Sequence, residues 1–284
     1  MTKVIELFGV PTRNLNADWQ EIVGKQNCPF SGKICFKGRK SEPDVKIGTC
    51  TVKYGRNGEP VIICPNRLLD RNQIFVDCLH LLTKHQPGNE YHLIPEFGVP
   101  GGSVDFVLAS AKDGRVIDFV GIELQTLDTT GTVWPERQKF LKEVGIPTEN
   151  FALRTFGMNW KMTAKTILVQ MHHKAATFSS VNRHLALVLQ DPLLGYMRKE
   201  FVLDHFASPA DVMDTVHFHS YGLEPSSHDA SSLQRLKLST RISTDLPGLE
   251  KCLGLKTNAQ VTKEDLIDRL SEKLSEATVF SPIR

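Results

Sequence analysis

Hydrophobic and polar positions alternate with two different periods in the middle of the chain. The segment 66–85 has apolar residues largely at helical spacing, which predicts a helix there. Three strand-like runs follow and predict strands over 91–97, 104–109 and 116–124. The dipeptide Asp113-Gly114 between the last two runs is typical of a tight turn, so we expect these two strands to form a hairpin.

The later half of the chain adds further helices and a strand to this pattern. The predicted elements are helices over 135–144 and 160–175, a buried strand over 184–190, and a closing helix after the capping-box-like sequence at 262–265. The region 201–242 shows no clear period. Because helices and strands follow one another in mixed order, the sequence predicts an α/β (α+β) fold.

Four of the six cysteines lie in a segment with an unusual composition. From position 27 to 65 the chain is rich in Gly, Pro, Lys and Cys and lacks a long apolar pattern, so it cannot build a core from its own side chains. Cys28, Cys35, Cys50 and Cys64 could supply the four thiolates of a tetrahedral zinc or iron site. Such a site has no open position, which favours a structural role. Four unconnected cysteines, or two cytosolic thiol pairs, are the alternative interpretation.

The same segment carries a local excess of positive charge. Between positions 25 and 56, only Glu42 and Asp44 oppose eight basic residues: Lys25, Lys33, Lys37, Arg39, Lys40, Lys46, Lys53 and Arg56. A surface that contacts phosphate would need such charges, in particular Lys37, Arg39 and Lys40. A solvated basic face explains them equally well.

The overall composition excludes several classes of protein. In 284 residues, 34 Lys and Arg against 32 Asp and Glu leave a net charge of +2, which excludes a polycationic nucleic-acid coat and an acidic disordered tail. No apolar run approaches the roughly 20 residues that span a bilayer. Glu6 interrupts the start of the chain too early for a signal peptide. We therefore expect no membrane association and a cytoplasmic protein, in which stable disulfides are rare.

The predicted hairpin carries the clearest chemical signal. Glu123 and Gln125 are two positions apart on one strand, so their side chains point to the same face, and Asp105 lies on the preceding strand. Buried carboxylates must be paired or bind metal. Two carboxylates on adjacent strands can hold a hard divalent cation such as Mg²⁺, with water and phosphate oxygens completing its shell.

This layout resembles the Asp…Glu-x-Lys motif of the PD-(D/E)xK nucleases, with Gln125 in the position of the lysine. The order of helix, acid-bearing hairpin and helix is also that of the PD-(D/E)xK core. As a bare pattern, Asp with Glu-x-Gln also occurs by chance. The chain departs from the motif twice, since Val104 replaces the proline before Asp105 and Gln125 cannot act as a cation. In an active site, Gln125 would position the attacking water through its amide, without neutralising phosphate charge.

Longer matches make the resemblance specific to one family. The chain resembles the NotI family of type II restriction endonucleases over roughly its first half. The segments that carry this resemblance are Leu7-Phe8-Gly9-Val10-Pro11-Thr12, Cys28-Pro29-Phe30, Gly48-Thr49-Cys50, Ile63-Cys64-Pro65-Asn66-Arg67 and the run from Phe119 to Gly131.

The resemblance implies two metal sites. One is a structural iron, with zinc as the alternative, bound by the four cysteines Cys28, Cys35, Cys50 and Cys64. The other is a catalytic Mg²⁺ bound by Asp105 and Glu123, with Gln125 beside them. Glu96 is the best match to a further upstream carboxylate of the active site, and Glu90 is a weaker candidate.

The resemblance also implies the substrate and the partners. The expected enzyme is a Mg²⁺-dependent homodimer that cuts double-stranded DNA at a short GC-rich palindrome of the CGGCCG kind, in a bacterial cytoplasm with a cognate DNA methyltransferase. The expected domains are a four-cysteine metal-binding module over 1–66, a PD-(D/E)xK nuclease core over 67–200, and a C-terminal region over 201–284 for DNA binding or dimerisation. The alternative is a DNA-binding regulatory protein with the same metal site and an inactive nuclease-like core.

The remaining residues with ligand-type side chains are interpreted as structural. His217 and His219 alternate on a candidate strand and His172-His173 is a second pair, and we expect surface or hydrogen-bonded histidines at these positions. Cys78 falls within the apolar pattern of the predicted helix and is expected in the core.

Overall fold

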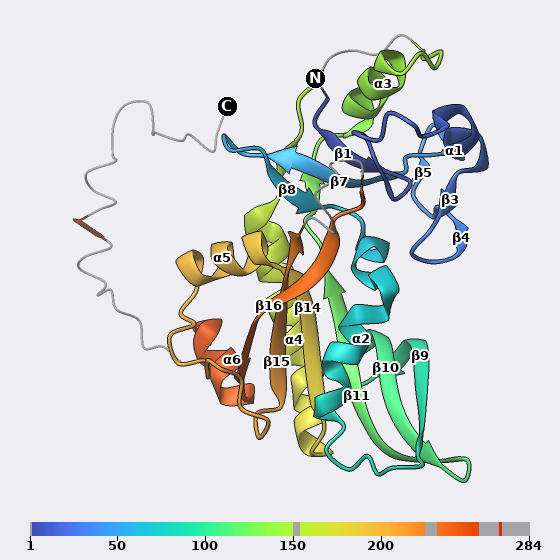
Figure 1. Cartoon of the computed structure of the whole chain (residues 1–284). Coiled ribbons are helices and arrows are strands. Elements are labelled where there is room, and N and C mark those ends of the chain that lie inside the picture. Colours follow the sequence, from blue (N-terminus) through green and yellow to red (C-terminus); the bar gives the residue numbers. More distant parts are fainter. Residues whose placement is uncertain (1, 150–153, 225–231, 256–266, 269–284) are drawn as a thin grey trace, which may run out of the picture.

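The computed structural model describes residues 2–149, 154–224, 232–255 and 267–268, and its strands form a small sheet near the N-terminus and a large six-stranded sheet (Figure 1). The small sheet has the order β2-β1-β7-β8, formed by β1 (Val4–Leu7), β2 (Val10–Pro11), β7 (Thr49–Tyr54) and β8 (Glu59–Ile62). The large sheet has the order β16-β15-β14-β11-β10-β9, formed by β9 (Glu90–Val99), β10 (Gly102–Lys112), β11 (Arg115–Gln125), β14 (His184–Gln190), β15 (Val216–Glu224) and β16 (Arg235–Thr244).

Short strand pairs and helices complete the described chain. The two-stranded pairs are β3 (Asn27–Cys28) with β4 (Lys33–Ile34), β5 (Gly38–Arg39) with β6 (Glu42–Lys46), and β12 (Thr129–Thr130) with β13 (Gly157–Met158). The helices are α1 (Trp19–Lys25), the 3₁₀-helix η1 (Pro65–Asn72), α2 (Gln73–Cys78), the 3₁₀-helix η2 (Leu79–Leu81), α3 (Trp134–Glu143), α4 (Trp160–Ser180), α5 (Asp191–Glu200) and α6 (Leu246–Cys252). This mixture confirms the predicted α/β class.

The large sheet is antiparallel at both edges and parallel in its middle. β9, β10 and β11 pair antiparallel, β11, β14 and β15 pair parallel, and β16 pairs antiparallel with β15. The predicted hairpin is confirmed, because Asp113 and Gly114 form the two-residue connection between β10 and β11. Their φ angles of 49° and 73° are both positive, as a type I′ turn requires.

The predicted helix over 66–85 is not continuous. Three short helices, η1, α2 and η2, replace it. Arg71 and Asn72 have φ angles of 55° and 57°, in the left-handed region. A right-handed helix cannot pass through such residues, so the chain bends between η1 and α2.

The region 201–242, which lacked a predicted pattern, holds β15 and most of β16. Both strands join the sheet that contains β10 and β11, so hydrogen-bonded strands from both sides of position 200 share one sheet. The predicted domain boundaries stay a prediction. The closing helix expected after 262–265 lies outside the described residues.

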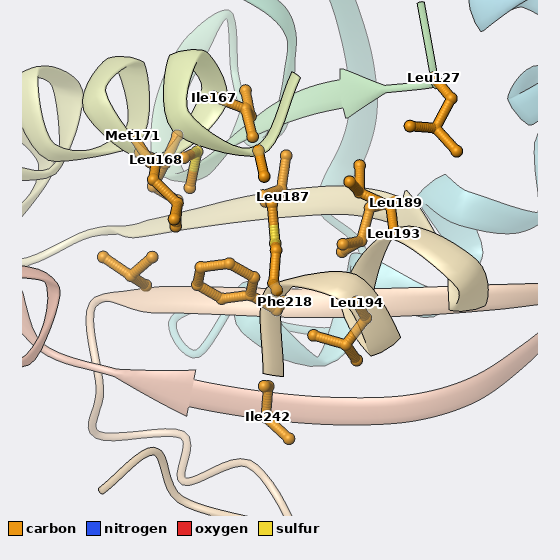
Figure 2. Close-up of a cluster of buried hydrophobic side chains, with 14 of the residues drawn as sticks. Leu127, Ile167, Leu168, Met171, Leu187, Leu189, Leu193, Leu194, Phe218 and Ile242 are labelled. Carbon is orange, nitrogen blue, oxygen red and sulfur yellow. The ribbon is translucent and has the colours of Figure 1, made fainter. Parts of the chain in front are cut away.

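Helix α4 covers one face of the large sheet. Figure 2 shows Ile167, Leu168 and Met171 of α4 packed above Leu187 of β14 and Phe218 of β15, all at most 1 % exposed. The other face packs against α2 and η2, through Ile74, Phe75, Cys78, Leu81 and residues of the central strands. The large sheet is therefore buried on both faces at its centre, as parallel strands usually are. Within the described residues, no helix combines the length and apolar character needed to cross a membrane.

The small sheet shares a hydrophobic cluster with a helix that is distant in sequence. Phe140 and Leu141 of α3 pack with Val4 and Leu7 of β1, and the ring of Phe140 meets that of Trp19 edge to face at 4.7 Å. Cys28 and Cys35 line the same cluster. The N-terminal segment therefore depends on packing against later parts of the chain.

A buried charged network joins the start of the chain to η1. The fully buried guanidinium of Arg67 donates to both carboxylate oxygens of Glu6, at 2.8 Å and 3.1 Å, and to Asp70 at 3.2 Å. It also donates to the backbone carbonyl of Gln234, just before β16. Charged groups with so little exposure persist only when they are paired in this way.

Candidate active site

The acids of β10 and β11 face each other across the hairpin. Phe106 of β10 pairs with Ile122 of β11, so Asp105 and Glu123 form the next opposite pair. Opposite residues of an antiparallel pair project to the same face of a sheet. On β11 the register with β14 places Glu123 opposite Leu187, whose side chain packs under α4. Both acids therefore lie on the face that α4 covers.

Glu96 extends this pair to a row of three carboxylates. On β9, its neighbours Pro95 and Phe97 pair with Phe106 and Val104, which leaves Glu96 opposite Asp105. Glu96 has a φ of 50°, an uncommon conformation for a residue with a side chain and one that often marks functional sites.

Glu90 does not join the row. It pairs with Ala111 near the far end of the hairpin, roughly 20 Å along the strand from Glu96 at about 3.3 Å per residue. Its carboxylate lies 3.4 Å from the ring of His92. Of the two upstream candidates, Glu96 is the one beside Asp105 and Glu123. We refer to Glu96, Asp105 and Glu123 as the acidic row.

A lysine that the sequence analysis did not select completes the site. Nζ of Lys174, on α4, lies 2.5 Å from Oε1 of Glu123, and both side chains are buried. Lys174 falls on the largely apolar buried stripe of α4, between Met171 and Ala175. A lysine on an apolar helical stripe was the only sequence signal of this contact.

Charge and burial act together on the acidic row. Burial raises the pKa of Glu123 to about 7, the bond from Lys174 opposes this shift, and the charge of Asp105 adds to it. The pKa of Asp105 is also raised, chiefly because surrounding chain withdraws its carboxylate from water. The N–H of Leu124 and the charge of Lys174 lower it, while Glu96 raises it. The row is thus electrostatically coupled, and a cation would relieve its repulsion.

The turn between β9 and β10 fixes the row against α4. Gly101 has a φ of 94°, and a Cβ there would lie 2.7 Å from the carbonyl oxygen of His173. Thr177 donates its hydroxyl to the carbonyl of Pro100 at 2.9 Å. The glycine thus allows the hairpin turn to touch the backbone of α4 beside Lys174.

Gln125 lies on the same strand face, two residues after Glu123. Its amide nitrogen donates to the carbonyl oxygen of Thr126 at 2.6 Å. The amide oxygen of Gln125 therefore remains the group that can accept a hydrogen bond from water.

The four predicted cysteine ligands converge in the N-terminal segment. Cys28 ends β3, Cys35 follows β4, Cys50 lies in β7 and Cys64 follows β8. All four are free thiols and at most 7 % exposed. The structure thus gathers four residues that span 37 positions of sequence.

Interactions among the thiols show that they are neighbours. A hydrogen bond from Cys50, together with the charge of Lys37, lowers the pKa of Cys64 to about 6, although burial opposes this. The pKa of Cys50 is raised, first by this bond and then by burial. The pKa of Cys35 is raised mainly by burial, and Cys64 and Cys28 add to it. The amide of Asn66 contacts Sγ of Cys28 at 3.8 Å.

The types of side chain in the two clusters suit the expected metals. Four buried thiols with N–H donors nearby suit iron or zinc, and the acidic row suits Mg²⁺. In the described part of the chain, however, no three His, Cys, Asp or Glu side chains are arranged to hold a metal ion.

Two of the three basic residues expected to contact phosphate have partners within the protein. Arg39 bridges Glu42 at 2.9 Å and Glu149 at 3.2 Å and stacks over Trp134 at 4.6 Å. Lys37 donates to the carbonyl oxygen of Ile63. Lys40 is exposed, which makes it the best placed of the three for phosphate.

Of the histidines interpreted as structural, His217 and His219 are fully buried, His172 is partly buried and His173 is exposed. Nε2 of His217 lies 2.8 Å from the carbonyl oxygen of Asp214, and Nδ1 of His219 lies 3.6 Å from Sγ of Cys78. His172 faces Glu250 at 3.8 Å. Cys78 is fully buried, as expected.

A comparison with protein families places this geometry in a known group. The family described as Restriction endonuclease NotI matches residues 24–218, which is more than half of the 284-residue chain. The chain belongs to the NotI restriction endonuclease family. As a member of this family it is a restriction endonuclease, an enzyme that cuts DNA. A comparison with curated proteins gave no match.

The NotI match reaches well beyond the first half of the chain. It includes all four cysteines and the whole acidic row, and it extends through α4 with Lys174 into β15. The residues that this structure gathers into the candidate site therefore all lie within the family region.

Proposed function

We propose that this chain is a Mg²⁺-dependent type II restriction endonuclease that hydrolyses phosphodiester bonds of double-stranded DNA. The observation that carries the proposal is the acidic row, Glu96, Asp105 and Glu123, aligned across three adjacent strands. Membership of the NotI family supports the same reaction. The strand layout supports a PD-(D/E)xK core, with Gln125 in the lysine position.

The acidic row provides the ligands that this reaction needs. Asp105 and Glu123 would hold Mg²⁺, and Glu96 is placed to join them. The bound cation would supply a nucleophile from water and stabilise charge on the phosphate. The amide oxygen of Gln125 would orient the attacking water, since its nitrogen is already bonded to Thr126.

The four cysteines support a second, structural metal. Cys28, Cys35, Cys50 and Cys64 would bind one iron ion, with zinc as the alternative, and hold together a segment of short strand pairs. Four thiolates would saturate that ion, so it would take no part in cleavage.

The assembly and the biological setting follow from the chemistry. Each chain has one acidic row, and both strands of a palindrome must be cut, so a two-fold homodimer is the simplest arrangement. From the resemblance of the sequence motifs to the NotI family, we propose a GC-rich palindrome of the CGGCCG kind as the site. An enzyme of this specificity in a bacterial cytoplasm needs a cognate DNA methyltransferase to protect the host genome.

Plasmid digestion tests the proposal. The purified protein is incubated with plasmid DNA and Mg²⁺, and the ends of the fragments are sequenced. We expect a defined set of fragments with 5′-phosphate ends at one short palindrome. Asp105→Asn is the matched control and should leave the plasmid intact. A plasmid that shifts in a gel without being cut would instead support a DNA-binding regulator with an inactive nuclease-like core.

A further inference from the structure

Lys174 lies in the protein interior, whereas most lysines lie at the surface. Its side chain is 7 % exposed, lies on the buried stripe of α4, and ends at Oε1 of Glu123, the last member of the acidic row. Burying an ammonium and a carboxylate usually costs about as much free energy as their attraction returns. An apolar residue of similar volume would pack this stripe at least as well, so stability alone does not account for Lys174.

The acidic row needs a nearby positive charge, and β11, which carries Glu123 and Gln125, does not supply one. Gln125 stands where the motif lysine would stand, and its amide is neutral and bonded to Thr126. Three carboxylates and a DNA phosphate would otherwise repel one another across a partly buried surface. Lys174 reaches the row from α4, on the face to which Asp105 and Glu123 project.

The contact between the β9–β10 turn and α4 keeps Lys174 in register with the row. Gly101 allows the turn to lie directly on the backbone of His173, and Gly102 lies against the Lys174 side chain, with 3.4 Å from an added Cβ to Cε. The structure thus fixes the lysine relative to Glu96 and Asp105 through backbone contacts.

We propose that Lys174 is a positioning residue of DNA hydrolysis. From helix α4 it supplies the positive charge that a lysine at position 125 would provide in the PD-(D/E)xK motif, where this chain has Gln125. This inference rests on the proposed function. Lys174 holds the Glu123 carboxylate on the face of the acidic row, and it yields that carboxylate when a divalent cation binds. The ammonium and the cation therefore compete for Glu123, while cleavage needs both.

Competition gives this role a signature that a purely structural lysine would not have. Lys174→Met removes the charge and keeps an unbranched side chain, and Lys174→Gln is a second neutral variant that can still hydrogen bond to Glu123. Lys165→Met, at an exposed position of the same helix, is the matched control. Thermal unfolding followed by circular dichroism establishes that each variant is folded.

Two measurements are made on each folded variant. Single-turnover cleavage of plasmid DNA in Mg²⁺ should slow by roughly 100-fold in both Lys174 variants, as expected for loss of a preorganised charge. Binding of Mn²⁺ alone, followed by electron paramagnetic resonance at about pH 8, should tighten by roughly tenfold because the competing ammonium is gone. Glu123→Gln should weaken Mn²⁺ binding, which shows that the ion reports on the acidic row.

Slower cleavage together with tighter Mn²⁺ binding supports the proposal. Cleavage within roughly threefold of the wild-type rate would overturn it, and so would Mn²⁺ binding that is unchanged or weaker. If the wild-type protein does not cut DNA at all, the proposed function fails. The Mn²⁺ measurements then still decide whether Lys174 competes for Glu123.

Discussion

The carboxylate of Asp105 accepts a hydrogen bond from the backbone N–H of Leu124, with 2.7 Å between Oδ2 and the amide nitrogen. This bond ties the acid of β10 to the strand that carries Glu123. Asp105 therefore has two separable roles, as an acceptor that joins two strands and as a negative charge in the acidic row.

Substitutions of Asp105 should separate these roles. Asp105→Asn keeps an acceptor oxygen for Leu124, so its free energy of unfolding should stay close to that of the wild type. Asp105→Ala loses the acceptor, so its free energy of unfolding, measured in urea, should be about 1 kcal/mol lower than that of the wild type. Cleavage should fall by several orders of magnitude in both, because each loses a charged ligand for Mg²⁺.

Binding and a control variant complete this test. Specific DNA binding in Ca²⁺, measured by gel shift, should survive Asp105→Asn because the site loses only one repulsive charge. Asp113→Asn, in the exposed β10–β11 turn, should leave both cleavage and stability unchanged. Near-normal cleavage by Asp105→Asn would place the active site elsewhere in the chain.

Gly101→Ala should disturb the site through the backbone. A Cβ at this position meets the carbonyl of His173 at 2.7 Å, so the turn or α4 must move. Together with the positive φ, this should cost about 2 kcal/mol of stability and slow cleavage by displacing Glu96 and Lys174. Urea unfolding and single-turnover cleavage measure the two effects.

Gly145→Ala is the matched control for this change. Its φ of 80° is similarly positive, but nothing lies within 4 Å of an added Cβ. We expect a smaller loss of stability and normal cleavage. Equal cleavage defects in the two variants would show that the contact with α4 does not position the site.

Cys50→Ser should lower both the metal content and the thermal stability of the protein. Elemental analysis of the wild type should find about one iron or zinc per chain, because four thiolates complete one tetrahedral site. Cys252→Ser, at a buried cysteine of α6 outside the cluster, should retain the metal. Wild-type protein that cuts DNA normally without iron or zinc would contradict the structural metal site.

Stability should decline in acid partly because of His217. Burial first, and then the charge of His184, lower its pKa from the ordinary value of 6.5 to about 3. His80 also lowers it, whereas Asp211 and the carbonyl of Asp214 raise it. Below pH 6.5 the unfolded chain binds a proton at this histidine, whereas the folded chain does not until the pH approaches 3. The contribution of neutral His217 to the free energy of unfolding is therefore complete above pH 6.5 and is lost as the pH falls toward 3.

The contribution of His217 is measurable as a slope. Below pH 6.5 this one group should remove about 1.4 kcal/mol of unfolding free energy per pH unit. His217→Gln should reduce the slope of stability against pH between 6.5 and 5 by roughly that amount, whatever its effect at neutral pH. His92→Gln, at an exposed histidine, should leave the slope unchanged.

Lys40→Gln should weaken DNA binding equally for all sequences and reduce the salt dependence of the affinity by about one counterion. Lys40 is exposed, whereas the guanidinium of Arg39 is held by Glu42 and Glu149. Arg39→Gln should therefore leave the salt dependence almost unchanged. A change in sequence preference, with an unchanged salt slope, would make Lys40 a base-reading residue.

The hairpin of the active site could be predicted because its signals are local. Strand alternation put Glu123 and Gln125 on one face, and Asp113-Gly114 defined the turn between β10 and β11. Lys174 could not be found in this way, because it comes from a helix 51 residues after Glu123. Tertiary packing decides which strand that helix covers, and the local spacing of apolar residues carries no information about it.

β15 escaped prediction for a different reason. It carries His217, His219 and Ser220 at buried positions, so its sequence lacks the apolar run of an inner strand. Groups from elsewhere in the chain contact these side chains, for example Asp191, which accepts from the Ser220 hydroxyl at 2.6 Å. A buried polar strand of this kind cannot be told from a loop until its partners are known.

The buried guanidinium of Arg67 has a consequence for anyone who builds chimaeras from this family. It is held by Glu6, by Asp70 and by the carbonyl of Gln234, which belong to three distant stretches of the chain. A graft that joins one relative to another at position 66 would take Glu6 and Arg67 from different parents, and an uncompensated charge would remain in the interior wherever the two parents differ at these positions. Exchangeable units should keep Glu6, Arg67 and Asp70 together from one parent, which puts the first usable crossover after η1.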